Sequence, residues 1–447
     1  MNPALSPLLT DLYQLTMMQV YHDRNMEDEA VFELFFRSLP DQRDVLVACG
    51  LAQVLDYLTH LRFSPEEIAF LREDGRFDRR FLDSLATLRF TGAVHAMPEG
   101  TIFFANEPVI RITAPLNQAQ LIETRLINII QFQTLIASKA VRMKQAAPDK
   151  MLVDYGFRRA QGGEAGVLAA RASYLAGFSG TATVLAGKLF GIPLFGTMAH
   201  SFIQAHDSEQ EAFVNFGLSH PDNVVLLLDT YDTERAAKKV VAMANEFRRQ
   251  NIVIKGVRLD SGDTIEMSRR VRAILDEGGL QDTSILVSGN LDEYILEQFR
   301  SQQAPVDGFG IGTKMTTSAD LPYLDCCYKM VEYKGIGRRK LSKGKATWPG
   351  KKQVYRHLSP ERLMTGDTLA LADETPQGTP LLQQYMAGGK LITELPSLTA
   401  SREYLLEQLA QLPPRPQRGK AYPVEPSPTL LDYTAKVTEQ MLAGSER

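Results

Sequence analysis

Apolar and polar positions follow two different patterns, and the pattern changes near residue 150. In the first part, helical periodicity alternates with short apolar runs, which predicts an α+β region. The helical patterns cover residues 8–22, 45–61, 65–71 and 116–145, and the apolar runs cover 30–36 and 109–112. We expect the long pattern at 116–145 to lead into a second domain.

Beyond residue 150, short apolar or β-branched runs recur and each ends in polar residues. These predicted strands cover 151–154, 192–197, 224–229, 252–260, 284–290 and 306–313, and helical patterns at 233–250, 264–277 and 291–301 lie between several of them. Strands that alternate with helices in this way indicate parallel βα units. No G-x-G-x-x-G motif follows any of the strands, which disfavours a dinucleotide-binding sheet. The pattern therefore predicts an irregular or incomplete parallel α/β barrel.

A chain of 447 residues exceeds what one hydrophobic core usually supports. We predict an α/β protein with three parts: an N-terminal α+β domain over 1–125, an α/β barrel over 126–335, and a C-terminal extension over 336–447. The extension holds a Pro-rich stretch at 412–428 and a predicted helix at 430–442. We expect this extension to pack on the first domain.

The charge balance and the cysteines narrow the class of protein. Lys and Arg number 49 against 53 Asp and Glu, a net charge of -4, which favours neither a nucleic-acid nor a membrane partner. No run approaches the roughly 20 apolar residues that span a bilayer, and the N-terminus has no signal-peptide pattern. The three cysteines, Cys49, Cys326 and Cys327, indicate reduced thiols in a cytoplasmic protein.

Polar residues and glycines gather where the six strands are predicted to end, which is where parallel βα barrels carry their reactive groups. In chain order they are Asp154 and Arg158; Gly196 to Ser201 with His200; Asp229 and Asp232; Arg258, Asp260 and Asp263; Ser288, Gly289 and Asn290; and Gly310, Gly312 and Thr313. Glycine backbone can approach a phosphate closely, aspartates can hold a divalent ion or a ribose diol, and arginines can pair with carboxylate or phosphate. The set suits a small phosphorylated sugar.

Each of these residues also has an ordinary structural explanation. A glycine at a strand end often makes a tight turn, a histidine in a loop is often only exposed, and Asp232 and Asp263 are equally suited to be helix N-caps. Recurrence at six equivalent positions favours a site. The stretch 334–356, with nine basic residues and no acid, leaves three alternatives open: a solvated loop, a loop that contacts a diphosphate or ATP, or a nucleic-acid patch.

Several motifs occur in a consistent order between residues 8 and 357. They are TDLYQ at 10–14, FELFFR at 32–37, MPEG at 97–100, GFRRAQG at 156–162, GTMAHSF at 196–202, LDTY at 228–231, GVRLDSGD at 256–263 and GIGT at 310–313. On these motifs the chain resembles the nicotinate phosphoribosyltransferases. The resemblance implies a type II phosphoribosyltransferase fold and a head-to-tail homodimer with shared active sites.

The resemblance also implies a reaction in NAD biosynthesis. Nicotinate, phosphoribosyl diphosphate and ATP would give nicotinate mononucleotide, diphosphate, ADP and phosphate, with Mg²⁺ as the metal ion. His200 matches the family's transiently phosphorylated histidine, and Asp229 falls where the family has an acid beside it. A carboxylate on one imidazole nitrogen fixes the tautomer and leaves the other nitrogen free to attack phosphorus.

Substrate-binding roles carry over by position, although the metal ligands do not. Tyr13 and Arg37 match residues contributed by the partner subunit. The positions expected to bind substrate within the same subunit are Tyr155, Arg158, Ser201, Arg258, Asp260, Gly289, Asn290, Gly312 and Thr313. Tyr155 would lie against the pyridine ring, Asp260 would face the ribose hydroxyls, and the last four would hold the 5′-phosphate.

Two rival functions remain from the sequence. Nicotinamide phosphoribosyltransferases resemble this chain but have an acidic residue where the segment at 177–183 has Ala182. Because an aspartate would repel a carboxylate, Ala182 favours nicotinate as the substrate. A non-catalytic nucleotide-binding barrel is the second rival, and the intact set of His200, Asp229, Arg258 and Asp260 argues against it.

Overall fold

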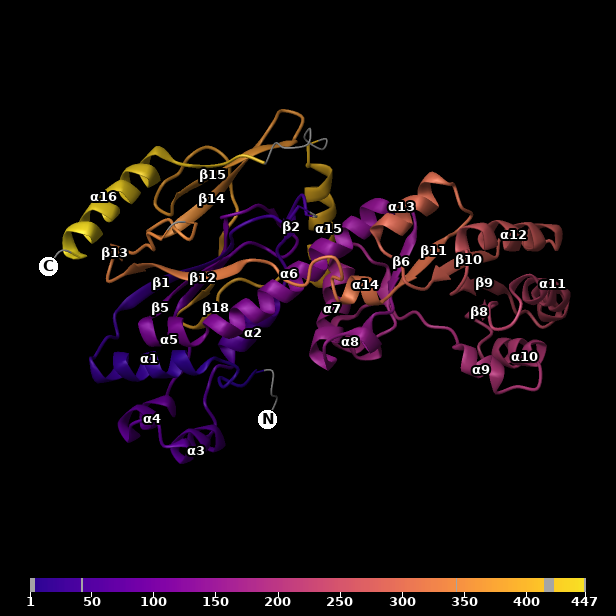
Figure 1. Ribbon diagram of the computed structural model, residues 1–447, viewed down its shortest axis with the longest axis horizontal. Coiled ribbons are helices and arrows are strands. Elements are labelled where there is room, and N and C mark those ends of the chain that lie inside the picture. The colour runs from indigo at the N-terminus through magenta and orange to yellow at the C-terminus, as the bar shows by residue number, and fades with distance from the viewer. Residues whose placement is uncertain (1–4, 42, 343, 414–421, 446–447) are drawn as a thin grey trace. The chain divides into compact units, whose positions relative to one another are not determined.

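The computed structural model describes residues 5–41, 43–342, 344–413 and 422–445. Lys343 and residues 414–421 of the Pro-rich stretch at 412–428 therefore lie outside the described residues. The chain forms two compact units (Figure 1). Unit 1 consists of Met1–Leu135 and Tyr323–Arg447, and unit 2 consists of Ile136–Pro322. The C-terminal extension thus belongs to the same unit as the N-terminal region.

Unit 1 is built on an antiparallel seven-stranded sheet. Its strands, in spatial order, are β13 (Ile336–Gly337), β12 (Cys326–Tyr333), β1 (Glu29–Phe36), β5 (Pro108–Pro115), β3 (Ala93–Ala96), β17 (Gln383–Ala387) and β18 (Lys390–Leu391). Seven of the eight residues of β1 are buried, because both faces of this central strand are covered. The predicted strand at 30–36 is confirmed.

Two smaller sheets and a set of helices complete unit 1. The sheets contain β16 (Thr379–Pro380), β14 (Lys352–Leu358), β15 (Met364–Leu371) and β19 (Val424–Pro426), and β2 (Leu46–Val47) with β4 (Ile102–Phe103). The helices are α1 (Leu12–Asp23), α2 (Leu51–Thr59), α3 (Pro65–Asp74), α4 (Arg79–Leu85), α5 (Leu116–Leu121), α15 (Leu398–Ala410) and α16 (Pro428–Ser445), and α6 (Glu123–Ala146) contains the boundary with unit 2.

The helical patterns of the N-terminal region are interrupted where the backbone requires it. The pattern at 45–61 splits into β2 and α2 because Gly50 takes a left-handed conformation with φ of 109°, which ends the extended segment. The pattern at 116–145 is likewise two helices, α5 and α6, separated at Ile122. Among the described residues, none of the helices combines the length and the apolar character that crossing a membrane requires.

Unit 2 contains a six-stranded parallel sheet. Its spatial order is β7 (Gly180–Thr181), β6 (Met151–Asp154), β11 (Gly308–Ile311), β10 (Ser284–Ser288), β9 (Ile254–Leu259) and β8 (Val224–Leu227). Within unit 2, the last strand in chain order, β11, pairs with the first, β6. The ring stays open between β7 and β8, as expected for an incomplete parallel α/β barrel, and the predicted fold class is confirmed.

One predicted strand of unit 2 is wrong. The run at 192–197 forms no strand but a single parallel bridge between Leu194 and Thr181, with hydrogen bonds on either side. Pro193 has no N–H to donate, and the chain then leaves the sheet at the exposed Gly196. The second strand of unit 2 in chain order is instead β7, whose two residues are too few to show a periodic pattern, and Leu194 bridges to its Thr181.

The helices of unit 2 follow the strands. They are α7 (Gly163–Leu175), α8 (Val184–Phe190), α9 (His200–Gln204), α10 (Glu209–Ser219), α11 (Thr233–Arg249), α12 (Thr264–Glu277), α13 (Glu293–Ser301) and α14 (Thr313–Thr316), with the 3-10 turn η2 (Phe157–Arg159). Asp232 and Asp263 are the N-caps of α11 and α12 and accept hydrogen bonds from Arg235 N and Glu266 N. The structural explanation therefore holds for these two aspartates.

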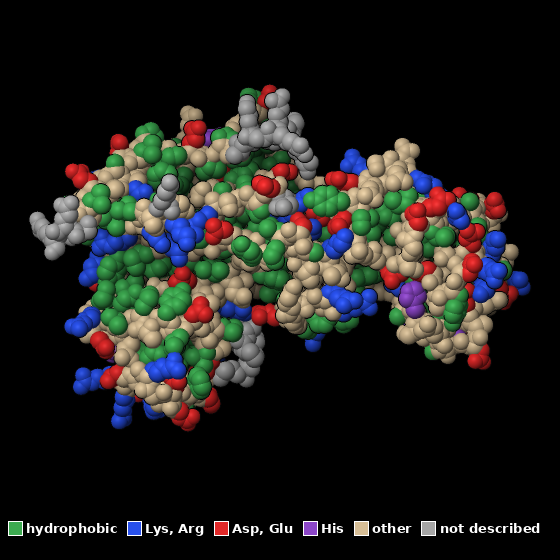
Figure 2. All heavy atoms as spheres, viewed as in Figure 1, with side chains coloured by type: hydrophobic (Ala, Val, Ile, Leu, Met, Phe, Trp, Pro, Cys, Tyr) green, Lys and Arg blue, Asp and Glu red, His purple; other side chains and the backbone are tan. Residues whose placement is uncertain are grey.

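Much of the basic stretch at 334–356 serves the structure of unit 1. Five of its basic residues bind partners in that unit: Lys334 pairs with Asp28, Arg339 donates to Thr438, Lys351 pairs with Glu29, Lys352 with Glu33, and Arg356 with Asp367. The hypothesis of a phosphate-binding loop is thereby confined to the segment around 338–345. On the face shown in Figure 2, basic and acidic side chains are interspersed over each unit, as the near-balanced charge leads one to expect.

Candidate active site

Strand register brings the predicted strand ends to one edge of the unit 2 sheet. Asp154 at the end of β6 lies opposite Ile311 of β11 on one side and Thr181 of β7 on the other. Ser288 of β10 pairs with Gly310 of β11, and the ends of β9 and β8 follow in order. Because all six strands are parallel, their carboxyl ends form a single mouth. This mouth is the candidate active site.

The loops after β10 and β11 have backbone that only small residues permit. Gly289 has a φ of 98°, and a Cβ added there would lie 2.2 Å from the carbonyl oxygen of Asp260. Asn290 follows with a φ of 52°, also in the left-handed region. A Cβ on Gly310 would lie 2.5 Å from the ring of Tyr155. The glycines thus allow close packing at the mouth and leave Gly289 and Asn290 exposed to an incoming group.

Asp154 is a buried hydrogen-bond acceptor that fixes the backbone at the end of β6. Its side chain is buried, and it accepts hydrogen bonds of 2.7 Å from Gly156 N and Thr181 Oγ1. Burial raises the pKa of this carboxyl, although hydrogen bonds from Thr181, Gly156 and Thr316 oppose the rise. The Asp154 carbonyl also accepts a bond of 2.8 Å from Ala182 N. Asp154 therefore fixes the exposed Ala182 at the mouth.

His200 begins α9 and lies at the mouth with its side chain 38% exposed. Its Nδ1 is 3.2 Å from Thr230 Oγ1, and its Nε2 is 3.8 Å from Asp260 Oδ2. Asp229, the carboxylate expected beside the imidazole, makes no hydrogen bond to His200 among the described residues. The direct partners of the imidazole are Thr230 and Asp260.

Asp229 instead supports the loop after β9. Its Oδ2 accepts hydrogen bonds from Asp260 N at 3.1 Å and from Ser261 Oγ. Its Oδ1 is buried and has no hydrogen-bond partner within the described chain. Asp260 in turn accepts a hydrogen bond from Ser288 Oγ through Oδ1, which leaves Oδ2 facing His200. Asp229 Oδ1 is therefore available to accept a hydrogen bond or to bind a cation.

The two predicted arginines of the mouth differ in environment. Arg258 is half-buried, and its Nη2 donates a hydrogen bond of 2.7 Å to the carbonyl of Met198 in the loop before His200. Its Nε is buried without a partner in the described chain. Arg158 lies on η2, is exposed, and makes no hydrogen bond or ion pair with a described residue. Arg258 is thus fixed in place, whereas Arg158 is free to meet a ligand.

The remaining predicted residues fall into two groups. Ser201, Gly312 and Thr313 lie with the others in unit 2, where Gly312 precedes the short helix α14 and Ser201 is exposed on α9. Tyr13 and Arg37 belong to unit 1. Tyr13 is 45% exposed on α1, and burial together with Glu123 raises its pKa to about 12. Arg37 pairs with Asp325 at 3.5 Å.

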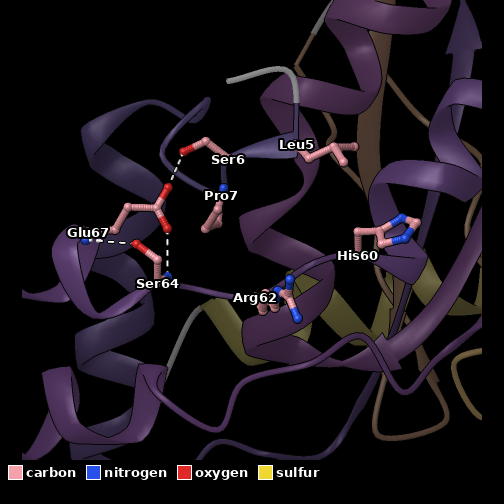
Figure 3. Close-up of a pocket in the computed structure, with 7 residues that line it drawn as sticks. All are labelled: Leu5, Ser6, Pro7, His60, Arg62, Ser64 and Glu67. Carbon is pink, nitrogen blue, oxygen red and sulfur yellow. Dashed lines mark hydrogen bonds between the residues drawn. The ribbon is translucent and has the colours of Figure 1, made fainter. Parts of the chain in front are cut away.

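Within the described part of the chain, the predicted site residues coincide neither with a cluster of metal ligands nor with the hollow found in unit 1. No group of three or more His, Cys, Asp or Glu side chains in the described chain is arranged to hold a metal ion. A hollow of about 430 Å³ in unit 1 (Figure 3) is lined by Leu5, Ser6, Pro7, His60, Arg62, Ser64 and Glu67. Glu67 there is already bonded to Ser6 and Ser64, the latter in the capping box of α3. The hollow contains none of the predicted site residues.

The sequence did not indicate the threonines that contact His200 and Asp154 at the mouth. Thr230 stands inside the LDTY motif but was not expected to contact His200, and Thr181 and Thr316 carried no signal beyond a hydroxyl near a strand end. Their contacts join segments that are tens of residues apart, such as His200 with Thr230 and Asp154 with Thr181. Only the folded register brings them together.

Family models match the chain in three successive segments. Residues 8–131 match the nicotinate phosphoribosyltransferase (NAPRTase) N-terminal domain, residues 151–352 match the nicotinate phosphoribosyltransferase (NAPRTase) family, and residues 377–434 match the nicotinate phosphoribosyltransferase C-terminal domain. The last match extends into the C-terminal region, for which the sequence motifs gave no resemblance.

Individual relatives agree with the models. A nicotinate phosphoribosyltransferase of Mycobacterium tuberculosis is 44% identical over 435 residues, covering 96% of this chain and 93% of the relative. One of Bacillus subtilis is 41% identical, covering 82% and 76%. The crystal structure of human nicotinic acid phosphoribosyltransferase superimposes with a TM-score of 0.87 at 30% identity, covering 96% and 99%. This chain therefore belongs to the nicotinate phosphoribosyltransferase family.

Proposed function

We propose that this protein joins nicotinate to phosphoribosyl diphosphate, forming nicotinate mononucleotide and diphosphate in NAD biosynthesis. The observation that carries the proposal is the mouth of unit 2. There His200, Arg258, Asp260 and the loops after β10 and β11 meet at one sheet edge, in a chain that matches the family over nearly its whole length.

Each group at the mouth suits one part of the substrates. The loops at Gly289–Asn290 and Gly312–Thr313, in which only Gly312 is half-buried, offer backbone N–H groups to a 5′-phosphate. Asp260 has an oxygen available for ribose hydroxyls. Arg158 and Arg258 provide cations for the nicotinate carboxylate or the diphosphate, and Tyr155, held against Gly310, presents a ring for the pyridine.

We propose further that ATP drives the reaction through His200. An unprotonated imidazole nitrogen would attack the γ-phosphorus of ATP, ADP would leave, and water would later take the phosphoryl group as inorganic phosphate. Thr230 and Asp260 contact the two ring nitrogens and so orient the imidazole. Asp229 would act on the imidazole indirectly, through Asp260. It accepts hydrogen bonds from Asp260 N and Ser261 Oγ and so fixes the loop that carries Asp260.

The mouth suits a magnesium ion whose ligands would be the substrate's phosphates together with one or two carboxylates of the protein. Mg²⁺ in phosphate-binding sites usually has few protein ligands, so the lack of a three-residue cage among the described residues is compatible with it. Asp229, with its unpartnered Oδ1, and Asp260 are the residues that would hold it. Bound there, the ion would offset the negative charge of the diphosphate.

Substrate selectivity is proposed to favour the acid over the amide. Ala182, fixed by Asp154, leaves the mouth without the carboxylate that would accept a hydrogen bond from nicotinamide and repel nicotinate. Arg158 and Arg258 make the complementary attraction for a carboxylate. Nicotinamide phosphoribosyl transfer is therefore the less favoured reaction.

A homodimer with shared sites is also proposed, in the cytoplasm. Tyr13 and Arg37 match partner-contributed residues of the family, and α1 leaves Leu12, Tyr13 and Val20 exposed. In unit 2, α8 exposes Val184 and Leu189 at 70% and 57%. Exposed apolar clusters of this kind are typical of interaction surfaces. Mixing Tyr13→Ala with His200→Ala protein would restore coupled activity if sites are shared, and a fully active monomer would contradict this.

The direct test of function is product analysis. Purified protein is incubated with nicotinate, phosphoribosyl diphosphate and Mg²⁺, with and without ATP, and the products are identified by mass spectrometry. We expect nicotinate mononucleotide and diphosphate, with ATP increasing the yield and being converted to ADP and phosphate. Binding of phosphoribosyl diphosphate without any mononucleotide would instead support a non-catalytic barrel.

A further inference from the structure

The two loops expected to hold the 5′-phosphate are joined by an ion pair. Lys314 follows Thr313 directly, and Asp292 lies two residues after Asn290. Lys314 Nζ is 2.6 Å from Asp292 Oδ2, with the side chains 27% and 15% exposed. The pair therefore connects the loop after β11 to the loop after β10 at a half-buried position beside the mouth.

Asp292 has both of its oxygens engaged. Oδ1 accepts a hydrogen bond of 2.9 Å from Ile295 N as the N-cap of α13, while Oδ2 meets Lys314. Although burial raises the pKa of Asp292, the bonds from Lys314 and Ile295 outweigh it and lower the pKa overall. The carboxylate is therefore charged and fixed, and it sets where α13 begins and where Lys314 lies.

A buried network anchors the same two loops from behind. Glu293, the next residue, pairs with Lys139 of α6 at 2.6 Å, and each of these side chains is only 2% exposed. Lys139 also pairs at 2.8 Å with Asp320, which follows α14. Arg142 lies 2.9 Å from Glu293. The loops after β10 and β11 are thus both tied to α6, and the Lys314–Asp292 pair joins them to each other through side chains.

We propose that Lys314 and Asp292 are positioning residues that hold the two glycine-containing loops at the separation required to bind the phosphate of phosphoribosyl diphosphate. Without the pair, the Gly289–Asn290 and Gly312–Thr313 segments lose the side-chain link beyond the end of the β10–β11 ladder, and their N–H groups no longer converge on one anion. The inference rests on the proposed function, because it assumes that these loops bind that phosphate.

The proposal can be separated from a simple effect of charge. If Lys314 only attracted the anionic substrate, removing the negative charge of Asp292 would strengthen binding. If the pair positions the loops, the same change weakens binding. Asp292→Asn distinguishes the two explanations because asparagine is as good an N-cap as aspartate, so α13 keeps its start.

The experiment measures the binding of phosphoribosyl diphosphate by calorimetry, and the KM values for both substrates, in the full-length protein. Lys314→Met and Asp292→Asn should each weaken phosphoribosyl diphosphate binding about tenfold and leave the KM for nicotinate unchanged. Lys314→Arg should retain most of the affinity. Lys239→Met is the matched control, since Lys239 pairs with Glu209 at 2.8 Å between α11 and α10, and it should bind as the parent does.

The outcomes discriminate clearly. Unchanged or tighter binding by Asp292→Asn overturns the proposal, and if Lys314→Met alone weakens binding, Lys314 is a direct phosphate ligand instead. If Lys239→Met weakened phosphoribosyl diphosphate binding as much as Lys314→Met does, the loss would be a general effect of removing an ion pair. That result would also overturn the proposal. Failure of the parent to bind phosphoribosyl diphosphate would be a failure of the proposed function, distinct from these results.

Discussion

The same charged residue types behave differently in the two units. In unit 1, Arg356 and Asp367 form a two-bond pair whose side chains are 3% and 0% exposed, and Gln408 takes a further guanidinium N–H. At the mouth of unit 2, His200 and Asp260 are 38% and 34% exposed and 3.8 Å apart. The first pair is enclosed by protein, whereas the second has room for a ligand. Charge in a sequence thus indicates function only when the fold leaves it accessible.

The largest expected effect is on stability, in unit 1. Arg356→Met leaves Asp367 buried without its cation, which typically costs about 3–5 kcal/mol in the free energy of unfolding. Asp260→Asn, at the exposed mouth, should change that free energy by about 1 kcal/mol or less but reduce activity. Denaturant unfolding of both variants measures the contrast. If Arg356→Met and Asp260→Asn lowered the free energy of unfolding equally, Asp260 would contribute as much to stability as the buried pair does.

His200→Ala should have the next largest effect, on catalysis alone. Removing the phosphoryl acceptor should lower ATP-dependent phosphate release by more than about a hundredfold, while some ATP-independent mononucleotide synthesis remains at high phosphoribosyl diphosphate. Phosphate release and product formation are measured side by side. Full ATPase activity in this variant would exclude His200 as the acceptor.

A new carboxylate at the mouth should alter selectivity. Ala182→Asp places a negative charge where nicotinate's carboxylate is expected, so the ratio of specificity constants should move toward nicotinamide by about tenfold or more. Ala182→Asn, similar in volume but neutral, is the control for size. If the aspartate and asparagine variants shift the ratio equally, or not at all, charge at residue 182 does not determine selectivity.

The smallest effect concerns a buried acid of unit 1. Burial, and then the charge of Asp367, raise the pKa of Glu107 well above its ordinary value. The folded state therefore binds this proton more tightly than the unfolded state, so the stabilisation present below the unfolded pKa is lost as pH rises. The parent's melting temperature should fall relative to Glu107→Gln between pH 5 and pH 8. If the difference in melting temperature between the parent and Glu107→Gln stayed constant over this pH range, Glu107 would not titrate in this way.

Local patterns predicted some elements closely. The strand at 151–154 and the helix at 264–277 have the predicted ends, because each is a single strongly patterned segment bounded by turns. The failures came from short or interrupted segments, namely β7 with two residues and the run at 192–197, which contains Pro193.

The candidate site was predicted as a set of residues, but their contacts were not. Parallel strand ends place Asp229 and Asp260 at one edge, yet only the register shows that Asp260 faces His200 while Asp229 holds the neighbouring loop. The basic stretch at 334–356 differs, because there the sequence indicated a possible binding site and the structure shows mainly structural contacts. Three of its lysines, Lys334, Lys351 and Lys352, pair with acids near residue 30 that are hundreds of residues away in sequence, so an apparent patch proved to be largely a set of ion pairs.

The preference between nicotinate and nicotinamide tests most directly the claim that the mouth of unit 2 is a nicotinate phosphoribosyltransferase site. Specificity constants for both substrates are measured with the unmodified protein at saturating phosphoribosyl diphosphate and ATP. Charge-assisted hydrogen bonds to Arg158 and Arg258 predict a preference for nicotinate of about a thousandfold, equivalent to about 4 kcal/mol. An equal rate with both substrates, or a preference for nicotinamide, would contradict the claim.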